Sequence, residues 1–275
     1  VLMAWQGGME GGNAAAELLC GVGSPSGKLS DTFAKKLEDY PSSETFHESV
    51  KYVDYKEDIY VGYRYFETIP GADKAVNYPF GYGLSYTTFE RALVSAEEKQ
   101  GVIRVRVNVT NTGKYPGKEV MQLYAQAPQG VLGKAKRVLA AFEKTRLLAQ
   151  GETQLLTLEA PVAQLASYDD LGKIQKSAYV LEKGKYQFYL GTSVRETEQV
   201  FCFTMPEDTV TEQLTAKLVP TSLAERMLSD GSFEKLPQSE PNDPDYSAIK
   251  RVPREESDGF SPAVRALPGL SLIHI

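Results

Sequence analysis

Apolar and polar residues alternate through the middle of the chain, in runs that short turns separate. The alternating apolar positions are Ile103, Val105, Val107 and Val109, then Met121, Leu123 and Ala125, and later Tyr186, Phe188 and Leu190. A period of two places successive side chains on opposite faces of a strand, so each run predicts a strand with one buried face. Several such strands, separated by turns such as 111–113 and 183–185, predict an all-β domain of the β-sandwich type over residues 89–205.

The first region, residues 1–88, has a different pattern. An apolar run at 1–4 predicts the end of a buried strand, and the dense glycines at 7–12 predict a turn. A short helix is expected next, with Asn13 as its N-cap and Gly21 as its stop, followed by an extended segment at 28–33. This order is typical of an α/β sheet, but too few elements are present to close a parallel sheet. We therefore expect the C-terminal part of an α/β domain whose other strands precede this region.

The region after residue 205 predicts helices and a linker. The segments 209–212 and 222–225 have the Ser/Thr-x-x-Glu spacing of a capping box, and apolar residues at helical spacing follow each of them. From 237 to 256, prolines, acids and polar residues are typical of a connector toward a further domain. The last six residues, 270–275, match the translation of a transposon end used in sequencing libraries, so we expect them to be foreign to the natural protein.

The composition is that of an ordinary globular protein, with 42% hydrophobic and 24% charged residues. The formal net charge is −6, and no cluster of lysines and arginines offers a surface for phosphates or anionic lipid head groups. No apolar run approaches the roughly 20 residues that a membrane-spanning helix needs. We therefore expect a soluble chain with neither nucleic acid nor a membrane as its partner.

Cysteine and histidine are too scarce for most metal chemistry. Cys20 and Cys202 lie far apart in the sequence, and His47 and His274 are the only histidines. No zinc-ligand spacing, disulfide framework or nucleophile–His–Asp relay is indicated. We expect two buried free thiols, no metal and no cofactor, which leaves carboxylates and hydroxyls for any chemistry.

Two groups of carboxylates could be interpreted as acid/base machinery. Glu10 lies in the glycine turn, and Asp54, Glu57 and Asp58 form a cluster beside tyrosines. We favour hydrogen bonds that hold the turn as the role of Glu10, and a solvated face as the place of the cluster. Residues 52–86 also hold eight of the sixteen tyrosines, which could line a sugar-binding groove or pack between domains; we favour packing.

Four motifs, in order, resemble the C-terminal domain of family 3 glycoside hydrolases. They are Trp-Gln-Gly-Gly-Met-Glu-Gly-Gly-Asn-Ala at 5–14, Ser-Pro-Ser-Gly-Lys-Leu-Ser-Asp-Thr-Phe at 24–33, Ile-Tyr-Val-Gly-Tyr-Arg-Tyr at 59–65 and Pro-Phe-Gly-Tyr-Gly-Leu-Ser-Tyr at 79–86. The family pattern has glutamine where Met9 stands, and asparagine and proline where Ser24 and Ser30 stand. Residues 109–113, 117–120, 122–124 and 139–144 resemble the family's fibronectin type III-like domain, so the resemblance covers residues 1–205.

The resemblance implies an α/β plus all-β fold class in three parts. Residues 1–88 would be the C-terminal part of the family's α/β sandwich domain, and residues 89–205 its fibronectin type III-like β-sandwich. Residues 206–269 would be a mostly helical segment and a linker toward a missing domain. The family's permuted members have this order, with the catalytic barrel last, so we expect a (β/α)₈ barrel after this piece as its intramolecular partner. Those members point toward the cytoplasm, and secretion is left open.

The resemblance also implies a retaining hydrolase of the β-glucosidase type, acting on β-linked glycosides or oligosaccharides. Its chemistry needs an aspartate nucleophile and a glutamate acid/base about 5 Å apart. In the family these belong to the barrel and to an E-G-x-D-R-like stretch before the glycine turn, and neither motif is found in this sequence. We therefore assign no catalytic, cofactor-binding or metal-binding residue and expect this piece alone to be inactive. The alternative is a non-catalytic carbohydrate-binding or adhesion protein, against which the α/β motifs argue.

Overall fold

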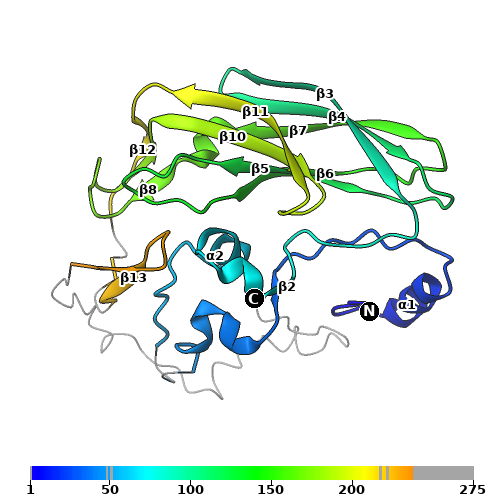
Figure 1. Ribbon diagram of the computed structural model, residues 1–275, viewed down its shortest axis with the longest axis horizontal. Coiled ribbons are helices and arrows are strands. Elements are labelled where there is room, and N and C mark those ends of the chain that lie inside the picture. The colour runs from blue at the N-terminus through cyan, green and yellow to red at the C-terminus, as the bar shows by residue number, and fades with distance from the viewer. Residues whose placement is uncertain (1, 48, 50–51, 217–218, 221–222, 238–275) are drawn as a thin grey trace, which may run out of the picture.

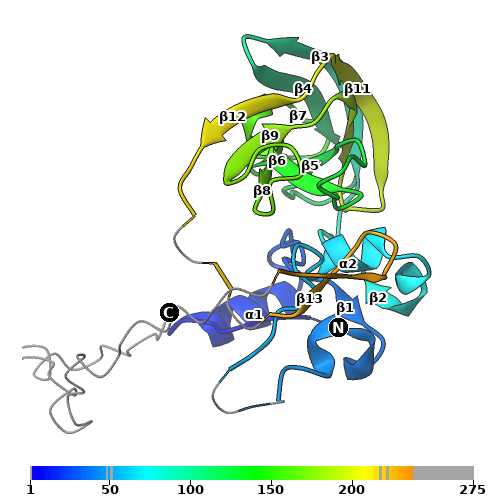
Figure 2. The ribbon, with the colours of Figure 1, turned by 90° about the vertical axis from the view of Figure 1, so that its left-hand side faces the viewer.

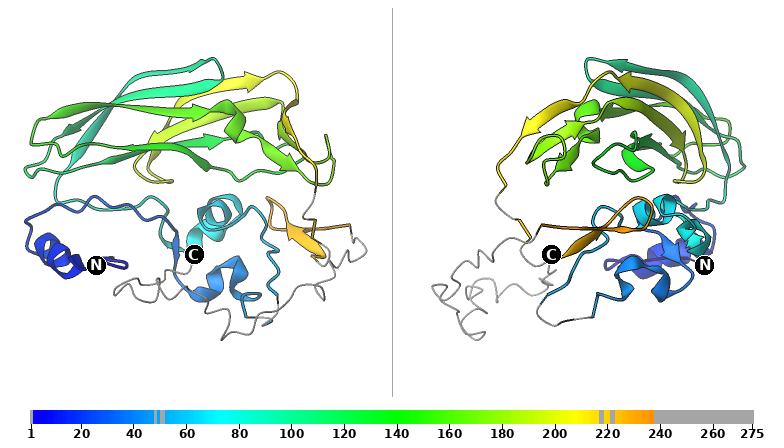
Figure 3. Two further views of the ribbon diagram at one scale, coloured as in Figure 1. Left: turned by 180° about the vertical axis from the view of Figure 1, so that it is seen from behind. Right: turned by 60° about the vertical axis from the view of Figure 1, so that its left-hand side comes forward.

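The molecule consists of a β-sandwich and a smaller part that lies along one side of it (Figure 1). The structure is a computed structural model that describes residues 2–47, 49, 52–216, 219–220 and 223–237. The helices and short strands of the first region lie below the sandwich in Figure 1, and the views from the side and from behind show the same two layers (Figures 2 and 3). Sheet dominates and helices are few, which agrees with the expected combination of α/β and all-β parts.

The sandwich is built from two antiparallel sheets whose apolar faces meet. One has the strand order β3-β4-β7 and the other the order β11-β10-β5-β6. The alternating residues at 103–109 and 186–190 are completely buried and form the core between the sheets, so the strands predicted there are confirmed. The strands are β3 (Phe89–Lys99), β4 (Val102–Asn111), β5 (Val120–Gln126), β6 (Val138–Lys144), β7 (Thr153–Pro161), β10 (Gly184–Gly191) and β11 (Thr197–Met205).

A third antiparallel sheet lies at one end of the sandwich and corrects the first predicted helix (Figure 1). Its order is β12-β9-β8, and residues 209–212, which carry the capping-box pattern, are extended in β12. Their run of threonine and valine favours a strand, and β9 offers backbone partners, whereas a short helix without packing is marginal in water. The elements are η4 (Val162–Leu165), β8 (Ser167–Asp169), β9 (Ala178–Leu181) and β12 (Thr209–Gln213).

A hairpin stands in place of the second predicted helix. β13 (Glu225–Met227) pairs with β14 (Phe233–Lys235), and between them the Leu228 amide donates to the Ser232 carbonyl at 2.7 Å. Gly231 has a φ of 85°, a conformation that suits a tight turn and not a helix. The helix predicted from residue 222 is therefore wrong over 223–237. The linker from 238 onward and residues 270–275 lie outside the described residues.

Helix α1 (Gly11–Leu19) begins earlier than predicted. Glu10 and not Asn13 occupies the N-cap position, and Asn13 lies inside the helix. The helix ends as predicted, because Gly21 takes a left-handed φ of 76° and donates its amide to the Leu18 carbonyl. This arrangement satisfies carbonyl groups that the last turn would otherwise leave without partners.

The described extended segments of the first region form one small sheet. β1 (Phe33–Ala34) pairs with β2 (Val76–Tyr78) in the antiparallel direction. Residues 2–4 form no strand, so the strand end predicted at 1–4 is wrong for the described residues. A strand needs a neighbour for its backbone groups, and the described chain places none there. The other elements are η1 (Leu37–Asp39), η2 (Pro41–Ser43), α2 (Tyr63–Thr68) and η3 (Ala72–Ala75).

The first region leaves much of its apolar surface exposed. No residue of α1 is buried, and large side chains on and around it, including Met9, Leu19 and Val22, face solvent. Cys20 and Cys202 are free thiols, but both are exposed, so the expected burial is wrong. Cys20 follows the exposed helix α1, which has no buried residue. Cys202 lies on the outer face of β11, whereas its neighbours Phe201 and Phe203 pack against the core.

Candidate functional site

An aromatic cluster joins the first region to the sandwich. Tyr63 of α2 stacks on Phe80 with ring centroids 4.4 Å apart, and Tyr124 of β5 lies edge-on to Tyr63 at 6.4 Å. The Tyr63 hydroxyl accepts a hydrogen bond from the Leu139 amide at 3.0 Å. Tyr124 is completely buried, and this burial raises its pKa far above the usual value. Of the eight tyrosines at 52–86, Tyr63 thus packs between the two parts as predicted. Packing does not hold for the whole set, because four of the eight are exposed: Tyr52, Tyr55, Tyr78 and Tyr86.

A buried glutamine holds the same junction by hydrogen bonds. The Gln122 side chain donates to the carbonyl oxygens of Thr192 at 2.7 Å and Gly81 at 3.3 Å, and it accepts from the Tyr124 hydroxyl at 2.5 Å. Gly81 has a φ of 80°, and a β-carbon there would overlap the Gln122 amide. The close approach of the 79–86 motif to the sandwich therefore depends on glycine at this position.

Glu10 lies beside a hollow of about 680 Å³ between the N-terminal segment and α1. Its carboxylate accepts a hydrogen bond from the Asn13 side chain at 2.6 Å and makes no capping bond to a backbone amide. This contact ties the turn to the helix, which agrees with the turn-holding interpretation. Among the described residues that line the hollow, Glu10 is the only titratable one, so an acid/base reaction there would lack a second group.

The acidic cluster lies against the β13–β14 hairpin. Glu57 is only 5% exposed, so the predicted solvated face is wrong for this residue, because the hairpin packs over the segment that carries it. Asp58 is exposed, as predicted, and lies 3.6 Å from the guanidinium of Arg226, while Asp54 is half-buried. Burial raises the pKa of Asp58 and outweighs the opposing attraction of Arg226.

Sequence reasoning did not find Arg226. Besides Asp58, its guanidinium contacts Glu234 and Asp170, and Asp170 is 56 positions away in the chain. An ion pair of such separation leaves no periodic pattern in a single sequence. The contact also depends on the β13–β14 hairpin, and the sequence had predicted a helix there.

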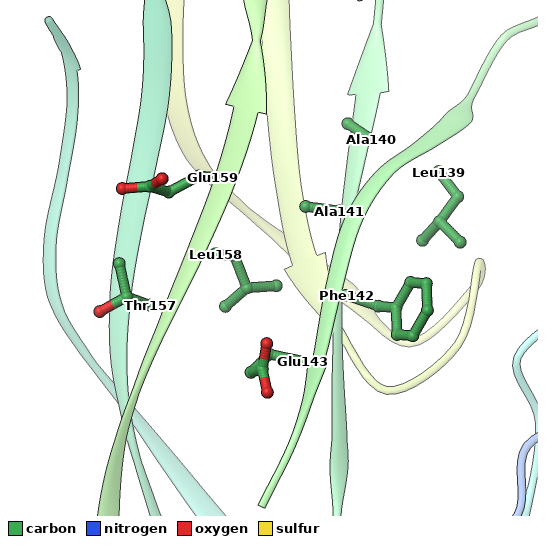
Figure 4. A pocket seen from close by; sticks show the side chains of 8 residues that line it. All are labelled: Leu139, Ala140, Ala141, Phe142, Glu143, Thr157, Leu158 and Glu159. Carbon is green, nitrogen blue, oxygen red and sulfur yellow. The ribbon is translucent and has the colours of Figure 1, made fainter.

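The sandwich carries a second hollow, of about 640 Å³, between the edge strands β6 and β7 (Figure 4). Its carboxylates are Glu143 and Glu159, and Glu159 is already paired with Arg104 at 2.7 Å. The hollow holds no nucleophile with an adjacent base. Within the described residues there is no group of three metal-ligating side chains, and no helix is long and apolar enough to cross a membrane.

Each of the two parts of the molecule matches the model of a known protein family. Residues 1–86 match the glycosyl hydrolase family 3 C-terminal domain, and residues 119–194 match the fibronectin type III-like domain. The chain belongs to glycosyl hydrolase family 3. The family 3 resemblance noted at the motifs of residues 5–86 and within residues 109–144 is thereby confirmed.

Curated family 3 relatives are similar over most of this chain. Beta-glucosidase A of Butyrivibrio fibrisolvens is 58% identical over 270 residues, which cover 92% of this chain and 32% of that protein. A beta-glucosidase of Ruminococcus albus is 44% identical over 98% of this chain and 27% of its own length. The chain thus spans about a third or less of the relatives that it matches.

Solved family 3 structures share the fold. The beta-glucosidase of Paenibacillus barengoltzii matches with a TM-score of 0.81 and 48% identity, over 86% of this chain and 27% of that one. Beta-glucosidase 3B of Thermotoga neapolitana, solved in complex with alpha-D-glucose, matches with a TM-score of 0.69 and 40% identity over 76% of this chain.

Proposed function

We propose that this chain is a structural part of a retaining glycoside hydrolase that acts on β-linked glycosides, with β-glucosidase as the activity of the complete protein. The observation that carries the proposal is the 58% identity with a beta-glucosidase across nearly the whole chain. The two hollows described above offer no pair of carboxylates free for glycoside hydrolysis.

The catalytic aspartate and glutamate lie, in this proposal, in the part of the relatives' length that this chain does not match. One substitute within the described residues would be the pair Asp58 and Asp170, because the pKa of Asp58 is raised as that of a general acid would be. Both carboxylates contact Arg226, however. A retaining pair must leave that space to a sugar ring. The role of this pair is therefore taken to be structural.

For the complete protein we propose the order α/β domain, sandwich, linker and then catalytic barrel. Support comes from the region after residue 205. The Ruminococcus albus protein matches 98% of this chain, which includes that region, whereas a Schizosaccharomyces pombe putative beta-glucosidase matches only 75%. The natural reading frame beyond residue 269 should encode the barrel.

Hydrolysis of an aryl β-glucoside tests the proposal. The 275-residue chain should release no aryl alcohol above the buffer control, whereas the protein encoded by the whole natural reading frame should turn the substrate over. Turnover by this chain alone would contradict the assignment of the catalytic residues. A reading frame of tandem sandwiches without a barrel, with binding to insoluble polysaccharide, would support the alternative of a non-catalytic carbohydrate-binding or adhesion protein.

A further inference from the structure

The β13–β14 hairpin lies beside the first region, below the end of the sandwich that carries β8 and β12 (Figure 1). We propose that this hairpin is an ionic latch in which Arg226 is the shared cation. The latch locks the first region to the sandwich at a point separate from the aromatic junction. Its contacts come from three segments that are far apart in the sequence.

The backbone of the hairpin is attached to the first region. The Met227 amide donates to the Lys56 carbonyl at 2.7 Å, and the Lys56 ammonium lies 3.5 Å from the Glu225 carboxylate. Met227 is buried, and Gly231 at the turn lies against Ile69, which follows α2. The hairpin therefore has an apolar anchor and a backbone bond on the first region.

Arg226 connects this anchored hairpin to the sandwich. Its Nη1 lies 3.0 and 2.9 Å from the two carboxylate oxygens of Asp170, and its Nε donates to Glu234 at 2.8 Å. The same Nη1 lies 3.6 Å from Asp58, and the Arg226 side chain is 14% exposed. A planar guanidinium can serve several carboxylates at once in fixed directions, which the flexible point charge of lysine does less well.

The sandwich holds its side of the latch in a rigid loop. The Asp169 carboxylate is buried and accepts backbone hydrogen bonds from the four residues 172–175, at 2.7 to 3.0 Å. Burial opposes ionisation of Asp169, but these hydrogen bonds prevail and lower its pKa. The loop so held presents Asp170 to Arg226, and it presents Lys173 to Glu234 at 2.9 Å.

The charges explain why the contact acts as a latch. Three carboxylates, Asp58, Asp170 and Glu234, share the two cations Arg226 and Lys173. Removing the Arg226 charge leaves three negative groups close together with one cation, so the hairpin is pushed away. The aromatic junction of Tyr63, Phe80 and Tyr124 shares no residue with this network, so the two parts stay together when the hairpin opens.

Hydrogen exchange on the 275-residue chain tests the latch. In Arg226→Met we expect the protection of the Met227 amide to fall about tenfold or more, while the amides of β4 and β10 stay within about twofold of their original values. Arg226→Lys keeps the charge without the fork and should give an intermediate loss. Arg104→Met is the matched control, since it breaks the surface pair with Glu159 and should leave Met227 unchanged.

Unchanged protection of Met227 in Arg226→Met would overturn the proposal. If that variant instead loses protection throughout β4 and β10, its fold is disturbed as a whole. Hydrogen exchange of the unsubstituted chain at low and high salt then tests the latch. Raising NaCl from 0.05 to 1 M should then lower the protection of Met227 about threefold without affecting β4, because salt screens partly exposed charges. No change with salt would overturn the latch. Either failure leaves the proposed glycosidase function intact, because the test measures no catalysis.

Discussion

At the scale of single residues, buried polar groups decide the geometry of the turns. Asn111 is completely buried at the end of β4, and its side chain has a partner at both ends. It donates to the carbonyl oxygens of Tyr115 and Leu148, both at 2.8 Å, and accepts from the Thr87 hydroxyl at 2.7 Å. The sequence predicts a turn at Asn-Thr-Gly, but one chain cannot reveal that the asparagine also holds two distant loops.

Gly81→Ala should weaken the junction between the two parts. Any alanine at a φ of 80° costs about 1 kcal/mol, and here its β-carbon would also displace the Gln122 amide. Gly101→Ala is the matched control, because Gly101 has a φ of 76° and nothing within 4 Å of the added carbon. We expect Gly81→Ala to cost about 2 kcal/mol more than the control in thermal unfolding. Equal costs would mean that the Gln122 contact is not tight.

The latch carboxylates should respond to pH with opposite signs. Burial opposes the shift of Glu234, but hydrogen bonds from Lys173 and Arg226 lower its pKa. Its charge therefore stabilises the fold at neutral pH, and this contribution is lost as pH falls through the lowered pKa. Partial burial raises the pKa of Asp58, but its side chain is still 37% exposed, so its charge costs only a little stability at neutral pH, and acid removes that small cost.

Glu234→Gln should therefore lower the melting temperature at pH 7, by the equivalent of about 1 to 2 kcal/mol. Asp58→Asn should leave it unchanged or slightly raised, and asparagine tolerates the φ of 50° at this position. Thermal melts of both variants between pH 3 and 7 check the signs, and both differences should shrink toward pH 3. A lower melting point for Asp58→Asn at pH 7 would contradict the sign given for Asp58.

At the scale of elements, the alternation of 103–109 predicts its strand correctly because one face of β4 packs on the core and the other does not. The spacing of Thr209 and Glu212 fails as a helix signal because it describes only local bonds. Tertiary pairing with β9 supplies more backbone partners than a short helix would. The site divides in the same way: the turn role of Glu10 could be read locally, whereas burial of Glu57 and the partners of Arg226 depend on long-range packing.

At the scale of the whole molecule, the two parts differ in how completely they bury their apolar residues. The sandwich has a continuous core that includes Ile103, Val107 and Phe188, all completely buried. The first region has Tyr60 and Phe66 inside, but α1 contributes no buried residue. Stability should therefore be unequal along the chain, because local opening is easiest where few apolar contacts hold the backbone.

Limited proteolysis should reveal this difference. We expect a resistant core from near Phe89 to Met205. If the protease has no cleavage site between Met205 and the end of β12 at Gln213, the core should extend to Gln213. Cleavage should come first in residues 2–59, where exposed apolar and irregular segments alternate. Mass spectrometry of the fragments identifies the cut sites. Equal protection of residues 2–88 would show that the first region is stable without further strands.

Tryptophan fluorescence of this molecule comes from one exposed position, Trp5 in the first region. Trp5 is the only tryptophan of the chain, it is 64% exposed, and its nearest aromatic neighbour, Phe33, also belongs to the first region. Its fluorescence therefore emits from a watery environment and reports on that region alone. Melting of the sandwich is almost silent at tryptophan wavelengths. Trp5 also lines the hollow beside α1, so a segment that bound there would shift the tryptophan emission to shorter wavelengths.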